Sequence, residues 1–375
     1  MSISAGDRIG DYEVIESLGA GGMGQVYKVR HSISQRVEAL KLLHGELESV
    51  DAQERFSREI RVLARLHHPN IAVLHTAFRA GDRLAMVMEF VEGATLNSKL
   101  RPPGLSMAQA VGYIGQALAA LDFAHSHGVV HRDVKPSNMI IGADDVLKLV
   151  DFGVAASRED ARLTSSGQIL GSFHYMSPEQ IQGGVIDARS DIYSVGVTLY
   201  EAITGRVPID GPNHYAIMTG HLNRVPSSPS EVKPGVPMPL SQIVMRALAK
   251  DPVARYQTAN EMLSQLSQVS TDFAYPLTDM VTIVMPSNSP SGERGTPSSK
   301  GGGSSRPSAI AERPEVVEQV GKELAYFIGP IATIIVQRAA RGCTTVHELF
   351  AAVAPEIDSA QDREKFLAAR RRFAA

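Results

Sequence analysis

Hydrophobic and polar positions alternate in short runs over most of the first ninety residues, which is the spacing of β-strands. Each run is closed by Gly or by a polar turn. In one segment, Ala52–Leu66, apolar residues instead recur with a helical period. We therefore expect a small lobe with one helix and with strands at Asp11–Leu18, Gln25–Val29, Arg36–Leu43 and Leu84–Phe90.

From Ser106 onward the hydrophobic period becomes helical. It predicts helices at Ala108–His127, Ile192–Thr204, Leu240–Ala249 and Ala259–Gln268. Strands followed by helices are typical of an α+β fold. We expect one domain over residues 11–268, with a small lobe at about 11–90 and a helical large lobe at about 91–268.

The composition changes near Met285. Residues Pro286–Pro307 are rich in Ser, Gly and Pro. Such a segment cannot bury enough apolar surface to offset the entropy lost on ordering. We interpret 269–310 as a flexible linker.

Helical signals return in a third segment, 311–375. Pro314 suits the first turn of a helix, and Thr345 with Glu348 three residues later is a capping-box signature. Asp362–Phe373 predicts a last, basic helix. We expect a small all-α domain of three or four short helices.

Charge and cysteine content narrow the class of protein. The formal net charge is −3 over 375 residues, which gives no indication of a nucleic-acid partner. The single cysteine, Cys343, excludes an intrachain disulfide and a zinc site built on a thiol pair.

The N-terminus lacks a signal-peptide pattern. The apolar stretch Leu324–Val336 is much shorter than the roughly 20 residues of a membrane span. We expect a cytoplasmic protein without a membrane span.

A glycine-rich loop follows the first predicted strand and has the pattern G-x-G-x-x-G-x-V. Glycines let the backbone approach phosphates where a Cβ would collide. The pattern alone also marks dinucleotide sites and ordinary turns, but here a strand follows rather than a helix, which argues against a dinucleotide site. The candidate phosphate-binding residues are Leu18, Gly19, Ala20, Gly21, Gly22, Met23, Gly24, Gln25 and Val26.

A triphosphate also needs a cation. Lys41 ends the strand Val37–Lys41, about 20 residues after the glycines. An ammonium group that must point at phosphate needs an anionic partner, and Glu59 on the next helix is the candidate. Glu54 is the alternative, but the helical period favours Glu59 because it lies beside apolar positions.

Two polar motifs carry the remaining chemistry. His131–Asn138 reads H-R-D-V-K-P-S-N, and D-F-G begins at Asp151. Asp133 can accept or orient the proton of an attacking hydroxyl, and Lys135 can neutralise charge on a transferring phosphoryl group. Asn138 and Asp151 offer the oxygen ligands that Mg²⁺ prefers. Two unrelated polar turns are the alternative, but the glycine loop and Lys41 upstream weigh against it.

From Asp11 to Leu266 the order of these motifs resembles that of the eukaryotic-like Ser/Thr protein kinases of bacteria. The resemblance implies a bilobal kinase fold and transfer of the ATP γ-phosphoryl group to protein Ser and Thr hydroxyls, with Mg²⁺ or Mn²⁺ as the metal. One departure is visible, V-E-A-L-K at 37–41 where the family often has V-A-L-K. The implied adenine contacts are Val26, Ala39, the hinge residues Glu89 to Val91, Ile140 and the gatekeeper Met88.

The same resemblance implies residues that hold the protein substrate. Ser172 would bond both Asp133 and Lys135, and Glu179 would pair with Arg255. Asp191 would hold the backbone of the catalytic loop. Lys135 resembles the Ser/Thr branch of the family rather than the tyrosine kinases.

A hydroxyl run at Thr164, Ser165 and Ser166 is an expected regulatory site. By the resemblance, Arg132 lacks a full counter-charge until an anion arrives, and phosphate on this run would supply one. We therefore expect self-activation by phosphorylation, with a dimer for phosphorylation in trans.

Three alternatives stay open. An ATP-binding pseudokinase-like scaffold would keep the nucleotide site without transfer, which Asp133, Asn138 and Asp151 argue against. A small-molecule phosphotransferase generally lacks a segment like Gly171–Glu179. Residues 311–375 predict a protein-interaction module or an autoinhibitory bundle, with its basic end more often solvated than bound to nucleic acid.

Overall fold

The computed structural model describes residues 3–21, 24–43, 59–152, 173–270, 314–328, 332–340, 343, 345–357 and 360–370. They form two compact units, one within residues 1–279 and one within 280–375. Most of the predicted linker (269–310) lies outside the described residues. Each unit is therefore described by itself.

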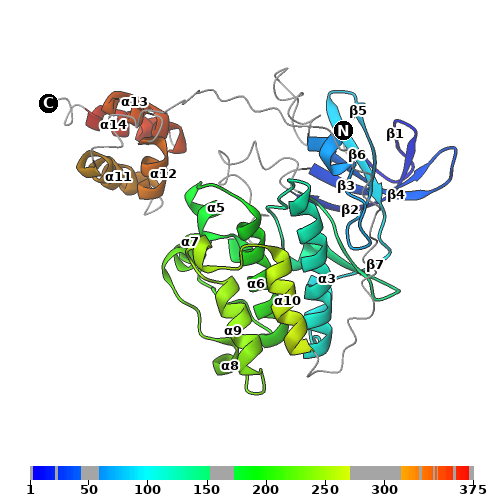
Figure 1. Ribbon diagram of the computed structural model, residues 1–375. Coiled ribbons are helices and arrows are strands. Elements are labelled where there is room, and N and C mark those ends of the chain that lie inside the picture. Colours follow the sequence, from blue (N-terminus) through cyan, green and yellow to red (C-terminus); the bar gives the residue numbers. More distant parts are fainter. Residues whose placement is uncertain are drawn as a thin grey trace, which may run out of the picture. The chain divides into compact units, whose positions relative to one another are not determined.

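The small lobe of the first unit is an antiparallel six-stranded sheet with the order β1-β2-β3-β4-β6-β5 (Figure 1). The predicted strands are present, and β1 and β5 were not predicted. Strand β5 has no clean alternation of buried and exposed residues, which explains why a period of two could not reveal it. The strands are β1 (Arg8–Ile9), β2 (Tyr12–Gly21), β3 (Gly24–His31), β4 (Val37–Leu43), β5 (Leu74–Ala80) and β6 (Arg83–Glu89).

The predicted helix at Ala52–Leu66 lies only partly within the described residues. Residues 59–63 are helical and residues 44–58 are outside the description. Leu63 and Leu66 pack against buried residues of the large lobe and of the sheet. The described end of this helix thus joins the two lobes.

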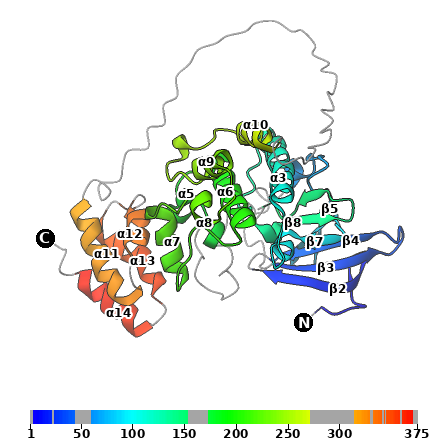
Figure 2. The same cartoon turned by 90° about the horizontal axis from the view of Figure 1, so that it is seen from below.

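The large lobe is helical, as predicted, and α3 packs against α6 and α10 (Figures 1 and 2). A three-stranded sheet, β7 (Gly93–Thr95), β8 (Met139–Gly142) and β9 (Leu147–Leu149), lies in the lobe beside these helices. The helices are α2 (Leu96–Lys99), α3 (Met107–Ser126), α5 (Pro178–Gln182), α6 (Ala188–Thr204), α7 (His214–Asn223), α8 (Pro229–Val232), α9 (Met238–Ala247) and α10 (Ala259–Ser270).

Local capping explains where the central helices begin. Helix α6 starts at Ala188, four residues before the prediction, because Asp187 caps it by accepting a hydrogen bond from the backbone N–H of Arg189 (2.9 Å). It ends before Gly205, whose φ of 83° is left-handed. Helix α3 starts after Ser106, which forms a capping box with Gln109. Both helices are buried around most of their circumference, which suits the centre of a lobe.

The second unit is a bundle of four described α-helices around its own core. They are α11 (Pro314–Ile328), α12 (Ala332–Ala340), α13 (Val346–Val353) and α14 (Ala360–Ala369). Helix α11 begins at Pro314, and the predicted capping box of Thr345 and Glu348 is present. Phe350 and Phe366 stack in the core with ring centroids 4.7 Å apart. Within the described part of the chain, no helix combines the length and apolar character needed to cross a bilayer.

Candidate active site

One buried carboxylate holds the backbone of the loop at 131–138. Asp191, in the first turn of α6, accepts hydrogen bonds from the backbone N–H groups of His131 and Arg132, each at 2.8 Å. His125 Nε2 reaches the same carboxylate at 2.7 Å from the end of α3. The predicted role of Asp191 as a backbone holder matches this geometry. His125 was not predicted, because a lone His at a helix end gives no signal of its own.

Asp133 lies at the centre of a small polar cluster. Lys135 Nζ is 2.7 Å from its Oδ2. Asn138 Nδ2 donates to the Asp133 carboxylate (3.0 Å) and to its backbone carbonyl (2.8 Å). The Asp133 side chain is about one third exposed (31%), so it is held in place yet open to solvent.

A second cluster joins the two lobes. Lys41 Nζ lies 2.8 Å from Oδ1 of Asp151, although 110 positions separate the two residues. Lys41 comes from β4 and Asp151 follows β9. Asp151 has a left-handed φ of 62°, a backbone state that Asp adopts more readily than most residues. The pairing of Glu59 with Lys41 stays a prediction, and Glu54 lies outside the described residues.

The two clusters are tied to each other through the backbone. The N–H of Val150 donates to the carbonyl of Asn138 (3.0 Å), and His131 Nε2 donates to the carbonyl of Val150 (3.1 Å). The His131 and Phe152 rings lie 4.5 Å apart. These hydrogen bonds link the segment that carries Asp133 and Asn138 to the segment that carries Asp151, which in turn pairs with Lys41.

Strands β2 and β3 form an antiparallel hairpin that carries the described residues of the glycine-rich segment, so a strand rather than a helix follows them. Gly21 lies opposite Gly24, and Val26 lies opposite Lys41 on the next strand. A Cβ on Gly24 would lie 2.4 Å from the carbonyl oxygen of Leu42, so only Gly fits there. Gly22 and Met23 lie outside the described residues. The strand register thus places the hairpin beside the Lys41 cluster.

The residues expected around adenine come from both lobes. Ala39 lies opposite Met88, and Glu89 ends β6 just before Val91. Ile140 belongs to β8 in the large lobe, two residues after Asn138. The Glu89 carboxylate is 2.9 Å from Lys148 Nζ on β9. A cavity beside Met88 is lined by Lys41, Asp151 and Phe152 and by apolar side chains.

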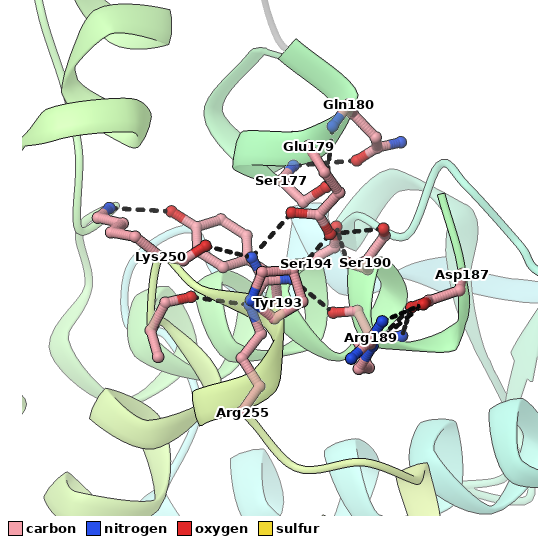
Figure 3. A network of polar contacts seen from close by, with 12 residues as sticks. Ser177, Glu179, Gln180, Asp187, Arg189, Ser190, Tyr193, Ser194, Lys250 and Arg255 are labelled. Atoms are coloured by element: carbon pink, nitrogen blue, oxygen red, sulfur yellow. Dashed lines mark hydrogen bonds and ion pairs between the residues drawn. The ribbon is translucent and has the colours of Figure 1, made fainter. Parts of the chain in front are cut away.

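Glu179 and Arg255 form the predicted ion pair, and both are buried (Figure 3). Each guanidinium Nη donates to one carboxylate oxygen at 2.8 Å, and Ser190 Oγ adds a third bond at 2.6 Å. Burial alone would raise the pKa of Glu179. The hydrogen bonds from Arg255 and Ser190 and the charge of Arg255 outweigh burial and hold that pKa below its usual value. The pair therefore stays charged at neutral pH.

A fully buried histidine lies beside this network. The Tyr193 hydroxyl shares a hydrogen bond with His221 Nδ1 (2.8 Å), and Arg255 lies over the Tyr193 ring at 4.9 Å. Burial, with a smaller contribution from Lys250, lowers the pKa of His221 to about 3. His221 is therefore neutral in the folded protein.

This histidine predicts a loss of stability in mild acid. Between pH 6.5 and about 3 the unfolded chain protonates His221 and the folded chain does not, so the free energy of unfolding falls as pH falls. From pH 6.5 to 5 we expect His221 to contribute a loss on the order of 2 kcal/mol. His221→Asn keeps a hydrogen-bonding side chain for Tyr193 but cannot titrate, so urea unfolding at several pH values should show a shallower loss. Equal pH slopes for variant and wild type would contradict this assignment.

Several predicted residues lie outside the described part of the chain. Thr164, Ser165, Ser166 and Ser172 fall in 153–172. Arg132 is described, with a left-handed φ of 67°. The regulatory role of the hydroxyl run and the bond from Ser172 stay predictions.

Comparison with known proteins agrees with this geometry. A family model described as a protein kinase domain matches residues 12–266. A second model, described as a domain of unknown function, matches residues 315–374. The first match contains all the motifs above, and the second covers the C-terminal helical unit.

Curated relatives match the first unit at moderate identity. A probable serine/threonine-protein kinase of Clostridium acetobutylicum is 37% identical over 264 residues, which is 70% of this chain and 40% of that protein. Serine/threonine-protein kinase PknJ of Mycobacterium tuberculosis is 39% identical over 266 residues, which is 69% of this chain and 45% of that protein. Serine/threonine-protein kinase PrkC of Bacillus subtilis is 37% identical over 260 residues, which is 68% of this chain and 40% of that protein. The chain thus matches less than half the length of each of these proteins.

Proposed function

Because the chain belongs to the protein kinase family, we propose that it transfers the γ-phosphoryl group of ATP to Ser and Thr hydroxyls of proteins. One observation supports this proposal above the others. Lys41 Nζ lies 2.8 Å from Asp151 Oδ1, next to the cluster of Asp133, Lys135 and Asn138. The relatives are named as serine/threonine-protein kinases, which supports Ser and Thr hydroxyls as the acceptors.

In the proposed reaction, Asp133 orients the attacking hydroxyl and accepts its proton. Asn138 donates to this carboxylate and so fixes its direction. Lys135 neutralises charge on the transferring phosphoryl group. Lys41 binds the α- and β-phosphates, and Glu59 orients Lys41. The hairpin at Gly19 to Gly24 covers the phosphates through its backbone.

The donor set fits a metal carried by the nucleotide. Asn138 and Asp151 would hold Mg²⁺ or Mn²⁺ through side-chain oxygens, and a bound ion would neutralise the β- and γ-phosphates. Among the described residues, no cluster of three His, Cys, Asp or Glu side chains could hold a metal by itself. Mg²⁺ commonly completes its shell with phosphate oxygens and water, so two protein ligands suffice.

Labelled phosphate transfer tests the proposal. The full chain, incubated with Mg²⁺ and ATP labelled on the γ-phosphate, should label an added mixture of unstructured peptides on Ser and Thr and not on Tyr. Chelation of the metal should stop transfer, and added Mg²⁺ should restore it. Binding of ATP without any transfer would instead support the pseudokinase-like scaffold. Label on a small molecule alone would support the phosphotransferase.

We also propose that the chain phosphorylates itself in the run Thr164, Ser165 and Ser166, in trans within a dimer. The new phosphate would supply the counter-charge for Arg132. Peptide mapping of the chain labelled in the same reaction checks this step. Label confined to other peptides would contradict it.

Residues 311–375 are proposed to bind a protein partner or to inhibit the kinase domain. Their support is a separate hydrophobic core with its own capped helices. Comparing transfer rates with and without this segment separates the two roles, since only loss of an inhibitor raises the rate. A cytoplasmic location and the absence of a nucleic-acid partner stay predictions from composition.

A further inference from the structure

Strand β4 carries a buried carboxylate at the position where this chain departs from its family pattern. Glu38 is only 1% exposed. Because side chains alternate along a strand, Glu38 shares the face of Leu40 and Leu42, while Ala39 and Lys41 share the other. Leu40 and Leu42 pack in the apolar core of the small lobe. An ionised group in such a layer costs several kcal/mol unless it is paired.

Two side chains contact the Glu38 carboxylate, a histidine and an arginine. His75 Nδ1 lies 2.5 Å from Glu38 Oε1, and Arg36 Nη2 lies 3.2 Å from the same oxygen. Arg36 is 61% exposed, so His75 is the more enclosed partner. Burial raises the pKa of the Tyr12 phenol, and the Glu38 carboxylate raises it further. Glu38 is thus contacted by the residue just before β4 and by β5, and its charge acts on Tyr12 of β2.

His75 reaches Glu38 because β5 has an irregular register. Leu74 lies opposite Met88 and Thr76 lies opposite Val87, so His75 has no residue opposite it. One extra residue in a strand redirects its side chain. Since β6 lies between β4 and β5, the imidazole spans a strand to make this contact.

The contact between His75 and Glu38 lies beside the last residue of β6, Glu89. Glu38 is opposite Glu89, whose N–H donates to the carbonyl of Val73 (2.8 Å) and whose carboxylate accepts from the Val73 N–H (3.2 Å). Val73 is two residues before His75. The irregular part of β5, the end of β6 and Glu38 are therefore joined in one small network.

We propose that Glu38 and His75 are a positioning pair that fixes the end of β6 against Ala39 and so sets the affinity for the adenine end of the nucleotide. The inference rests on the proposed function, because it assumes that ATP binds beside Ala39 and Glu89. Stability alone does not explain the pair, since even a buried ion pair, the strongest form such a contact could take, is often no better than apolar side chains of similar volume. The pair instead fixes the relative positions of β4, β6 and β5.

Nucleotide affinity of the full chain tests the pair, with the dissociation constant for Mg²⁺–ADP measured by calorimetry. His75→Leu is expected to weaken binding about fivefold or more, with kcat at saturating ATP nearly unchanged. His75→Asn keeps an N–H donor where Nδ1 lies and should retain near-normal affinity. The double variant Glu38→Val/His75→Leu removes both polar groups and should fold stably yet still bind weakly.

The control is Glu16→Gln, which removes an exposed partner of Lys28 on the same sheet and should not change affinity. Lower melting temperatures in the His75 variants with unchanged affinity would overturn the inference, as would equal weakening by His75→Asn. Binding without transfer in the wild type would overturn the proposed function alone, because the comparison of affinities would still stand. A wild-type chain that binds no nucleotide would overturn both.

Discussion

Asp133→Asn is expected to lower the rate of phosphoryl transfer by about 10²- to 10⁴-fold while nucleotide binding is retained. The carboxylate is the proposed proton acceptor, and a neutral amide cannot take that role. The replacement also removes the ion pair with Lys135 (2.7 Å). Asn138 can still donate to the amide oxygen, so the loop at 131–138 should keep its shape.

Initial rates of label transfer at saturating ATP measure this effect, with the dissociation constant for Mg²⁺–ADP determined in parallel. Asp144→Asn is the matched control. Asp144 lies in the turn between β8 and β9 and accepts a hydrogen bond from the Val146 N–H (3.2 Å), which an amide oxygen can also accept. A rate for Asp133→Asn close to that of the control would contradict the role assigned to Asp133. Loss of nucleotide binding would show that the change damages structure instead.

The ion pair between Lys41 and Asp151 illustrates what could be predicted from sequence. The two residues are 110 positions apart, and no local rule places them together. Triphosphate chemistry requires a cation, a metal ligand and a hydroxyl acceptor around one substrate, so the order of the motifs implied their convergence. The Glu179–Arg255 pair was expected only through family resemblance, because nothing local links two charges 76 positions apart.

Irregular geometry explains what could not be predicted. His75 contacts Glu38 only because β5 holds one unpaired residue, and that irregularity also removes the alternation that would have revealed β5 itself. His125 contacts Asp191 through the packing of α3 on α6. Hydrophobic periodicity reports faces of regular elements. It carries no information on a side chain redirected by an unpaired residue or placed at a helix end.

Arg255→Met is expected to destabilise the first unit by about 3–5 kcal/mol, because it leaves the Glu179 carboxylate buried without its counter-charge. Arg255 also donates to the backbone carbonyls of Arg189, Ala249 and Lys250, at 2.7–3.0 Å. Those acceptors would lose their partner as well. Urea unfolding followed by circular dichroism measures the effect, since the chain has no Trp to report by fluorescence.

Arg246→Met is the matched control for this variant. Arg246 pairs with Glu261 at 2.5 Å, but both side chains are more than one third exposed (44% and 38%). Such pairs contribute about 0.2–1 kcal/mol. The double variant Glu179→Leu/Arg255→Met removes the orphaned charge but not the orphaned carbonyls, so we expect it to recover part of the lost stability. Equal losses for Arg255→Met and Arg246→Met would contradict the view that burial determines the energy of the Glu179 pair.

Arg255→Met should also lower the rate of phosphoryl transfer, because the Glu179–Arg255 pair anchors α5 next to the loop at 131–138. Glu179 lies in α5, and the neighbouring Gln180 donates through Nε2 to the carbonyl of Arg132 (2.6 Å). Asp191 fixes the N–H of that residue from the other side (2.8 Å). If Glu179 shifts, α5 and its bond to Arg132 shift too, one residue before Asp133. Rates measured well below the unfolding temperature separate this positional effect from the loss of stability, and unchanged rates there would limit the pair to a purely structural role.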